Sequence, residues 1–160
     1  MLNINIICVG KIKEKFFSSA IEEYKKRLSK YCKITITEIQ DEKLPIKFHE
    51  AQLNITKTKE CNKIIEAIKK DSYVIALDLS GKQYTSVEFS KKLENIALNF
   101  GSSVTFIIGG TLGLNEDVLK LANEKISFSK MTFPHQLFRI FLLEQIFRAF
   151  KIQNNETYHW

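Results

Sequence analysis

The chain has 160 residues, a length that suits one domain, and its 44% hydrophobic and 26% charged residues are ordinary for a globular protein. No apolar run reaches the roughly 18 residues that a membrane helix needs, and the N-terminus lacks the basic-then-apolar order of a signal peptide, so a cytoplasmic protein without membrane attachment is expected. The three cysteines and three histidines lack C-x-x-C or H-x-x-x-H spacing, which predicts neither disulfides nor a metal site.

The net charge of +6 is concentrated in residues 1–33, which hold seven lysines and one arginine against three glutamates. A basic segment of this kind favours a polyanionic partner, with nucleic acid first. The lysine excess, together with abundant isoleucine and asparagine, equally fits an AT-rich genome. Charge alone therefore leaves a nucleic-acid partner open.

Strand and helix patterns alternate along the first part of the chain. The apolar run Ile4–Val9 is typical of a buried strand. Glu14–Tyr31 has apolar residues at helical spacing, and Lys33–Ile39 alternates as a strand does. Residues 40–50 are charged and contain a proline, which indicates a loop with the composition of a mobile segment.

The alternation continues to the C-terminus. The remaining expected strands are Tyr73–Leu79, Val104–Ile108 and Ile126–Ser129, and the expected helices are Thr56–Lys70, the one from the capping box Thr85–Glu88 to Asn99, and the one capped by Asn115. Gly101 is expected just past a helix end, and Pro134 at the first position of a last helix. The order predicts an α/β fold in which helices cover both faces of a largely parallel sheet, as one domain over residues 1–160.

Three segments follow predicted strands, at the edge where parallel sheets bind ligands. They are Leu77–Gly81, Gly109–Leu114 and Phe128–Pro134. Glycines let a backbone approach a ligand closely, although a tight strand–helix turn without a ligand explains the glycine loop as well. Its spacing matches neither G-x-G-x-x-G nor a P-loop. If the three strands are adjacent, the segments form one pocket that contacts a ligand mainly through backbone groups.

The last helix is apolar on nearly all sides, which one small core cannot bury, so a subunit interface is expected. Arginines within it are expected to form ion pairs, Arg148 with Glu144 one turn earlier. Alternatively, Arg139, one turn from His135, faces the pocket or a nucleic acid. The terminal Tyr158-His159-Trp160 either packs on the body of the protein or stacks on unpaired bases.

Several motifs occur together and in order: I-G-G-x-x-G-L, S-K-M-T-F-P-H-Q, L-x-E-Q-x-F-R-A-x-K-I and a terminal Y-H. With Val9-Gly10-Lys11, Tyr24–Arg27 and Asp41–Lys43, they resemble the ribosomal RNA large subunit methyltransferase H family of the SPOUT class over the whole chain. The resemblance implies a parallel-sheet SPOUT methyltransferase fold with a deep trefoil knot at about residues 104–152. It also implies a homodimer through the C-terminal helix, S-adenosylmethionine as cofactor, and N3 methylation of a pseudouridine in 23S rRNA within the assembled 70S ribosome.

The resemblance also assigns residues to the site. The implied cofactor contacts are Leu77, Gly109, Phe128, Ser129, Lys130, Met131, Thr132 and Phe133. Tyr158 and His159 match a tail that reaches the partner subunit's site, and Trp160 stands where family members usually have Lys or Arg. Thr111-Leu112 departs from the smaller or more polar residues often found there, which we expect to alter only the pocket rim. The catalytic candidates are His135, Arg139, Tyr158 and His159.

Two other interpretations are kept open. One is an enzyme that binds NAD or another nucleotide through the Gly109–Gly113 loop. The other is a non-catalytic RNA-binding ribosome factor. Cofactor screening separates them, since the first predicts binding of NAD, the second binding of neither cofactor, and a methyltransferase binding of S-adenosylmethionine.

Overall fold

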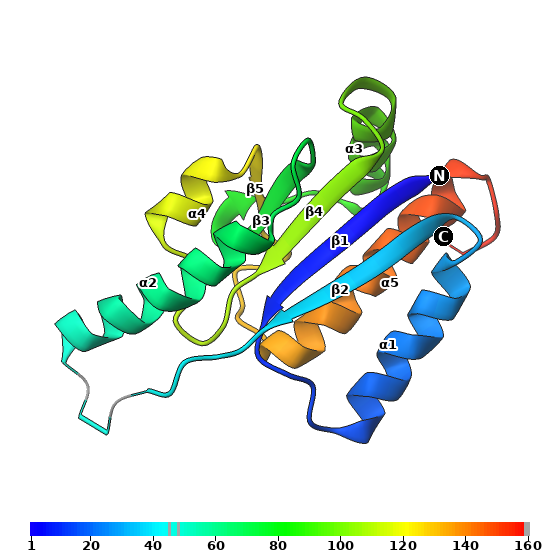
Figure 1. Ribbon diagram of the computed structural model, residues 1–160. Coiled ribbons are helices and arrows are strands. Elements are labelled where there is room, and N and C mark those ends of the chain that lie inside the picture. Colours follow the sequence, from blue (N-terminus) through cyan, green and yellow to red (C-terminus); the bar gives the residue numbers. More distant parts are fainter. Residues whose placement is uncertain (45, 48, 159–160) are drawn as a thin grey trace.

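A computed structural model describes residues 1–44, 46–47 and 49–158. One sheet of five parallel strands has the order β2-β1-β4-β3-β5 (Figure 1). The strands are β1 (Leu2–Val9), β2 (Cys32–Ile39), β3 (Tyr73–Lys82), β4 (Ser103–Ile108) and β5 (Glu124–Ile126), and the helices are α1 (Lys15–Leu28), α2 (Glu50–Ala67), α3 (Ser86–Asn99), α4 (Glu116–Leu121) and α5 (His135–Gln153). The predicted α/β fold with a parallel sheet is confirmed.

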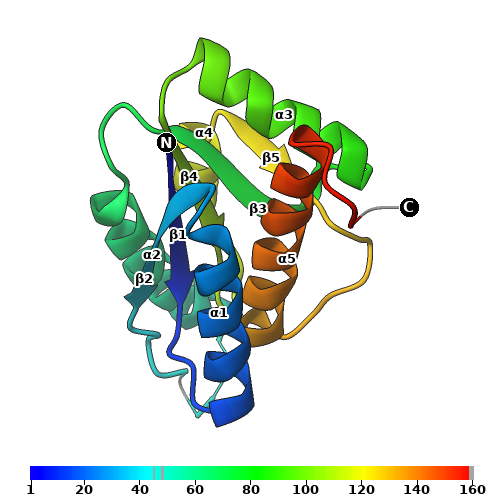
Figure 2. The same ribbon diagram turned by 90° about the vertical axis from the view of Figure 1, so that its right-hand side faces the viewer.

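Helices cover both faces of the sheet. Figure 2 shows α1, α5 and α3 side by side over one face, with α2 and α4 behind the sheet. Side chains of β1 alternate accordingly, since Ile4 and Ile6 join the core under α1, α3 and α5, whereas Ile7 and Val9 join the core under α2 and α4. Burial on both sides explains the nearly unbroken apolar runs of the central strands.

The path of the chain creates a crevice at the carboxyl ends of the central strands. After β1 and β3 the chain continues to helices on one face, and after β4 it continues to α4 on the other face. Loops that leave neighbouring strands toward opposite faces separate from one another, and parallel sheets bind ligands at such a point. The crevice therefore lies between the loops that follow β1, β4 and β3.

The predicted helix caps are confirmed. The backbone N–H of Glu88 donates to Thr85 Oγ1 at 3.1 Å, and the N–H of Thr85 donates to Glu88 Oε2 at 2.7 Å, which is a complete capping box. Asn115 Oδ1 accepts from the N–H of Val118 at 3.1 Å. Gly101 follows the end of α3 with φ +114°, a backbone conformation that favours glycine.

Several element boundaries differ from the prediction; α1, for example, ends at Leu28 rather than Tyr31, and α2 ends at Ala67 rather than Lys70. Helix α2 begins at Glu50 rather than Thr56, because its first turns are mostly exposed and carry no apolar face that periodicity could detect. Strand β3 runs to Lys82, past an irregular stretch in its pairing with β5. Strand β5 is Glu124–Ile126 rather than Ile126–Ser129, since the Ser127 and Ser129 hydroxyls bond within a turn that ends the strand. Pro134 is the N-cap of α5, not its first residue, and its carbonyl accepts from Phe138 at 3.0 Å.

Cys8, Cys32 and Cys61 are free and buried. Burial raises the pKa of the Cys8 and Cys32 thiols to about 12. None of the helices in the described part of the chain is long and apolar enough to cross a membrane. Within the same residues, no group of histidines, cysteines and carboxylates is arranged to hold a metal ion.

Candidate active site

The ends of β3, β4 and β5 meet around one cavity of about 230 Å³, here called the inner cavity. Its wall is formed by Leu77, Asp78, Leu79, Ile108, Gly110, Gly113, Leu114, Ile126, Ser127, Phe128, Ser129, Met131, Thr132, Phe133, His135 and Phe138. All three predicted strand-end segments contribute to this wall, which confirms that they form a single pocket. Most of the wall is apolar side chain or backbone, with a carboxylate at Asp78.

The glycine loop is held tightly against the sheet on one side and open on the other. A Cβ on Gly110 would lie 2.9 Å from Val9 Cγ1, so a larger residue does not fit there. The N–H of Gly113 donates to the carbonyl of Gly110 at 3.0 Å and closes a turn. Gly113 has φ +74°, and a Cβ there would meet nothing within 4 Å. The loop is thus a tight turn that also presents bare backbone to the cavity.

Six of the eight predicted cofactor residues line the inner cavity: Leu77, Phe128, Ser129, Met131, Thr132 and Phe133. Gly109 and Lys130 adjoin this wall in sequence without lining it. A Cβ on Gly109 would lie 3.0 Å from the carbonyl carbon of Gly113, so Gly109 closes the loop rather than facing the cavity. Cofactor contact by all eight residues stays a prediction.

His135 stands where three cavities meet. It lines the inner cavity, a larger outer pocket of about 680 Å³, and a third pocket of about 260 Å³ that contains Asp41 and Glu60. Burial, and next the charge of Arg139, lower the pKa of the imidazole, while Asp41 raises it less. His135 is therefore neutral at pH 7 and able to accept a proton.

Arg139 lies one turn behind His135 and lines none of these cavities. Its side chain is 1% exposed, its Nη1 donates to Glu38 Oε2 at 2.8 Å, and its Nη2 donates to the carbonyl of Gly10 at 2.6 Å. Glu38 Oε2 also accepts from the N–H of Ile12 at 2.9 Å. The structure thus favours the ion-pair alternative for Arg139, in which it fixes the turn after β1. The predicted catalytic role for Arg139, stabilisation of developing negative charge, stays a prediction.

Comparison with known proteins matches this geometry to one family. The family model described as "Predicted SPOUT methyltransferase" matches residues 2–159. A protein of Clostridium botulinum strain Kyoto, named ribosomal RNA large subunit methyltransferase H, is 60% identical over 158 residues that cover 99% of both chains. The chain belongs to the SPOUT methyltransferase family. A second relative, from Clostridium botulinum strain Eklund 17B and of the same name, is 56% identical with the same coverage.

The fold of this SPOUT family member also occurs in a solved structure. A probable methylase family protein from Haemophilus influenzae Rd KW20 gives a TM-score of 0.54 at 13% identity, covering 98% of this chain and 70% of that one. At this identity the likeness concerns the fold alone.

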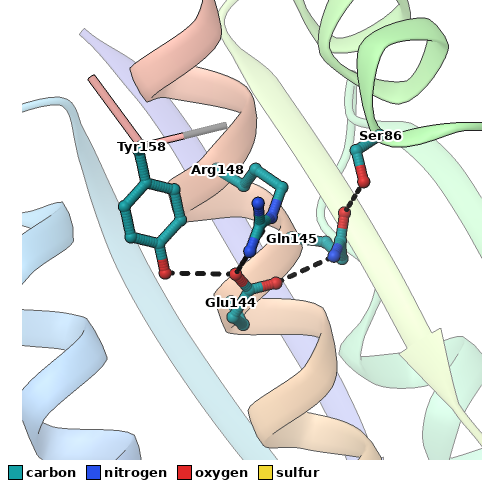
Figure 3. A network of polar contacts seen from close by, with 5 residues as sticks. All are labelled: Ser86, Glu144, Gln145, Arg148 and Tyr158. Carbon is teal, nitrogen blue, oxygen red and sulfur yellow. Dashed lines mark hydrogen bonds and ion pairs between the residues drawn. The ribbon is translucent and has the colours of Figure 1, made fainter. Parts of the chain in front are cut away.

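The C-terminal tail of this SPOUT family member is bonded to the middle of α5 (Figure 3). Glu144 Oε1 accepts from the Tyr158 hydroxyl at 3.1 Å and from Arg148 Nη2 at 2.7 Å. Glu144 Oε2 accepts from Gln145 Nε2 at 2.8 Å, and Ser86 donates to Gln145 Oε1 at 2.8 Å. The predicted Glu144–Arg148 pair is confirmed, and Tyr158 packs on the body of the protein.

Tyr158 is not brought to the His135 of its own chain. Glu144, to which it bonds, lies nine residues beyond His135 on α5, a rise of roughly 13 Å along the helix. His159 and Trp160 lie outside the described residues. The structure therefore brings His135 and Arg139 together and leaves Tyr158 apart from them.

Glu60 is a site residue that the sequence analysis missed. It is 5% exposed, and its Oε2 accepts from the N–H of Glu42 at 2.9 Å. No hydrogen bond reaches its Oε1 from any residue that the structure describes, and this oxygen would lie 3.6 Å from a Cβ on Gly110. A signal did exist, because Ile64 is an apolar residue of the predicted helix Thr56–Lys70 and is buried, and Glu60 precedes it by one helical turn.

Glu60→Gln is expected to stabilise the protein above the usual pKa of a glutamate. Burial, the largest effect, raises the Glu60 pKa. A group with a raised pKa in the folded state binds its proton more tightly there, so stability falls as pH rises from the unfolded-state pKa through the folded-state pKa. Calorimetry should show a melting temperature roughly 2–4 °C above wild type at pH 8, a gap that closes near pH 4. A gap independent of pH would contradict this.

Proposed function

We propose that the protein is an S-adenosylmethionine-dependent methyltransferase that methylates N3 of a pseudouridine in 23S rRNA on the assembled 70S ribosome, in the cytoplasm. The observation that carries the proposal is the inner cavity formed by three strand ends and joined to the outer pocket at His135. Family membership and the name of the 60% identical relative support it.

The residues present fit this cofactor. Mainly apolar cavities that also offer backbone groups, like the inner cavity, hold small molecules. The inner cavity and the outer pocket share Leu79, Gly110, Gly113, Thr132, Phe133 and His135, so a cofactor in the first and an acceptor nucleotide in the second would meet at His135. Backbone at Gly113 is open toward the space a ligand would take. Leu77, Phe128 and the other predicted contact residues would hold the cofactor. When bound, it supplies a methyl group already activated on a sulfonium.

Residues of the chain would accept the proton and position the reacting groups. The proton on N3 must leave as the new N–C bond forms, and the neutral His135 at the boundary of the two pockets is placed to accept it. Glu60 and His135 both line the adjoining acidic pocket. Arg139 and Glu38 fix the turn at Gly10 against which His135 packs, since a Cβ on Gly10 would lie 3.3 Å from His135 Nε2.

The proposal includes a homodimer and a knotted chain. The outward side of α5 keeps Leu137, Ile140 and Phe141 only half-buried, which supports a homodimer through this helix. Since Tyr158 lies far from its own His135, we propose that the Tyr158-His159 tail serves the partner subunit's site. The deep trefoil knot at about residues 104–152 is proposed from family membership.

The decisive experiment measures transfer of labelled methyl from S-adenosylmethionine into 70S ribosomes from a strain that lacks this protein, with free 23S rRNA alongside. Incorporation into intact ribosomes alone is expected. His159→Ala should lower turnover at least about 100-fold with cofactor affinity intact, the size of a general acid–base contribution. Normal turnover in His159→Ala would remove that residue from the mechanism.

A thermal-shift screen separates the alternatives. S-adenosylmethionine should raise the melting temperature and NAD should not. Stabilisation by NAD would favour a nucleotide-dependent enzyme, and ribosome binding without stabilisation by either compound would favour a non-catalytic RNA-binding factor.

A further inference from the structure

A large aromatic ring is exposed at the start of α1. Phe16 is 67% exposed, whereas its neighbour Phe17 is half-buried and lines the outer pocket. The two ring centroids are 4.4 Å apart. Phe16 therefore contributes little to the core and stands at the rim of the pocket that holds His135.

The charge around this ring is positive and unpaired. Lys11, Lys13 and Lys15 are exposed, and their ammonium groups form no ion pair with any residue that the structure describes. The only carboxylate in this segment is Glu14, so three positive charges stand against one negative charge.

At the far end of α1, in contrast, basic side chains form ion pairs. Lys25 pairs with Glu22 at 3.2 Å, and Arg27 pairs with Glu23 at 2.9 Å. Lys26 and Lys33 are also exposed and form no ion pair with a described residue, but they lie near the end of α1 and at the start of β2. Beside the pocket, the charges free to meet a polyanion are therefore those of Lys11, Lys13 and Lys15.

Exposed aromatic rings beside free lysines suit single-stranded nucleic acid. Each base has a π-face that stacks on an aromatic side chain, and lysines neutralise the adjoining phosphates. Phe17 and Glu14 belong to the wall of the outer pocket, so Phe16 is within reach of a nucleotide that neighbours one held in that pocket.

We propose that Phe16 is a stacking platform for an unpaired nucleotide of the RNA substrate, next to the nucleotide held in the outer pocket, with Lys11, Lys13 and Lys15 contacting its phosphates. This inference rests on the proposed function, and it identifies the β1–α1 turn as the surface that receives the RNA strand. It predicts that loss of the ring weakens RNA binding without altering the cofactor cavity.

The first test compares Phe16→Ala, Phe16→Trp and Phe100→Ala. Phe100 is a matched control, since it is 59% exposed and follows α3 at the opposite end of the sheet. Phe16→Ala should raise KM for ribosomes about 5- to 150-fold, which converts the usual stacking contribution of about 1–3 kcal/mol. Its kcat, melting temperature and affinity for S-adenosylmethionine should match wild type. Phe16→Trp should retain the wild-type KM, and Phe100→Ala should have no effect.

Equal KM values for Phe16→Ala and Phe100→Ala would overturn the proposal, as would a loss of kcat alone. A second readout needs no methyl transfer: benzoylphenylalanine at position 16, irradiated on 70S ribosomes, should crosslink to 23S rRNA. Crosslinks to ribosomal protein alone, or none, would overturn the stacking proposal. An inactive wild type that still crosslinks to rRNA through position 16 would instead discard the proposed reaction and keep the surface.

The lysines are tested by salt dependence. Lys11→Gln, Lys13→Gln and Lys15→Gln combined should flatten the slope of log affinity against log salt by about 2, the change expected when roughly three phosphate contacts to a single strand are lost. Lys25→Gln is the control, since this lysine is paired with Glu22. An unchanged slope in the triple variant would remove the phosphate contacts from the proposal.

Discussion

Gly81→Ala is expected to lower the melting temperature by roughly 10 °C, because the added carbon meets backbone that cannot move aside. A Cβ on Gly81 would lie 2.5 Å from the carbonyl carbon of Ile126 and 2.6 Å from its nitrogen. Relief of that contact requires β3 and β5 to separate, and overpacking of this kind costs about 3 kcal/mol. Because both strands end at the inner cavity, cofactor affinity should fall as well.

Gly101→Ala is the control for this experiment. Its φ of +114° strains any side chain, but a Cβ there meets nothing within 4 Å. It should lose about 1 kcal/mol from backbone strain and keep wild-type cofactor affinity. Equal losses in the two variants, measured by calorimetry and by titration with S-adenosylmethionine, would show that contact with Ile126 is not what requires glycine at position 81.

Glu38→Ala is expected to destabilise the protein by about 3–5 kcal/mol, and Arg139→Met by much less. The asymmetry follows from burial, since Arg139 is 1% exposed and Glu38 is 36% exposed. Removal of the glutamate leaves a buried guanidinium without its counter-charge, and arginine does not lose its proton in proteins. Removal of the arginine leaves a carboxylate that water can reach.

The double variant Glu38→Ala with Arg139→Met should recover most of the stability lost in Glu38→Ala. Urea unfolding of the wild type, the two single variants and the double variant completes a double-mutant cycle, which gives the coupling free energy between positions 38 and 139. A double variant less stable than Glu38→Ala would mean that Arg139 stabilises the fold mainly through the carbonyl of Gly10, not through its ion pair.

The fold was predictable where a residue's partners lie nearby in sequence. The capping box at Thr85–Glu88, the cap at Asn115 and the Glu144–Arg148 pair involve residues three or four apart, and all three were predicted. The alternation of strands and helices followed from periodicity in the same way. The start of α2 was predicted too late, because its first exposed turns carry no apolar face to detect.

The site was predictable only in part, since it depends on pairs far apart in sequence. The rule that parallel sheets bind ligands at their carboxyl ends selected the three segments of the inner cavity. The partner of Arg139 is 101 residues away, and no local pattern indicates Glu38. Likewise, Glu60 faces the pocket only because α2 packs against β1 and the glycine loop.

The three buried thiols allow local unfolding of the protein to be measured by alkylation, without any introduced cysteine. Alkylating reagents attack thiolates, and burial holds the pKa of the Cys8 and Cys32 thiols near 12, so neither reacts in the closed protein at ordinary pH. Cys8 lies on the interior strand β1 and Cys61 on α2, so mass spectrometry of each labelled peptide measures how fast that strand or helix opens. A single cysteine introduced on the surface would accept a dye without removal of the native three.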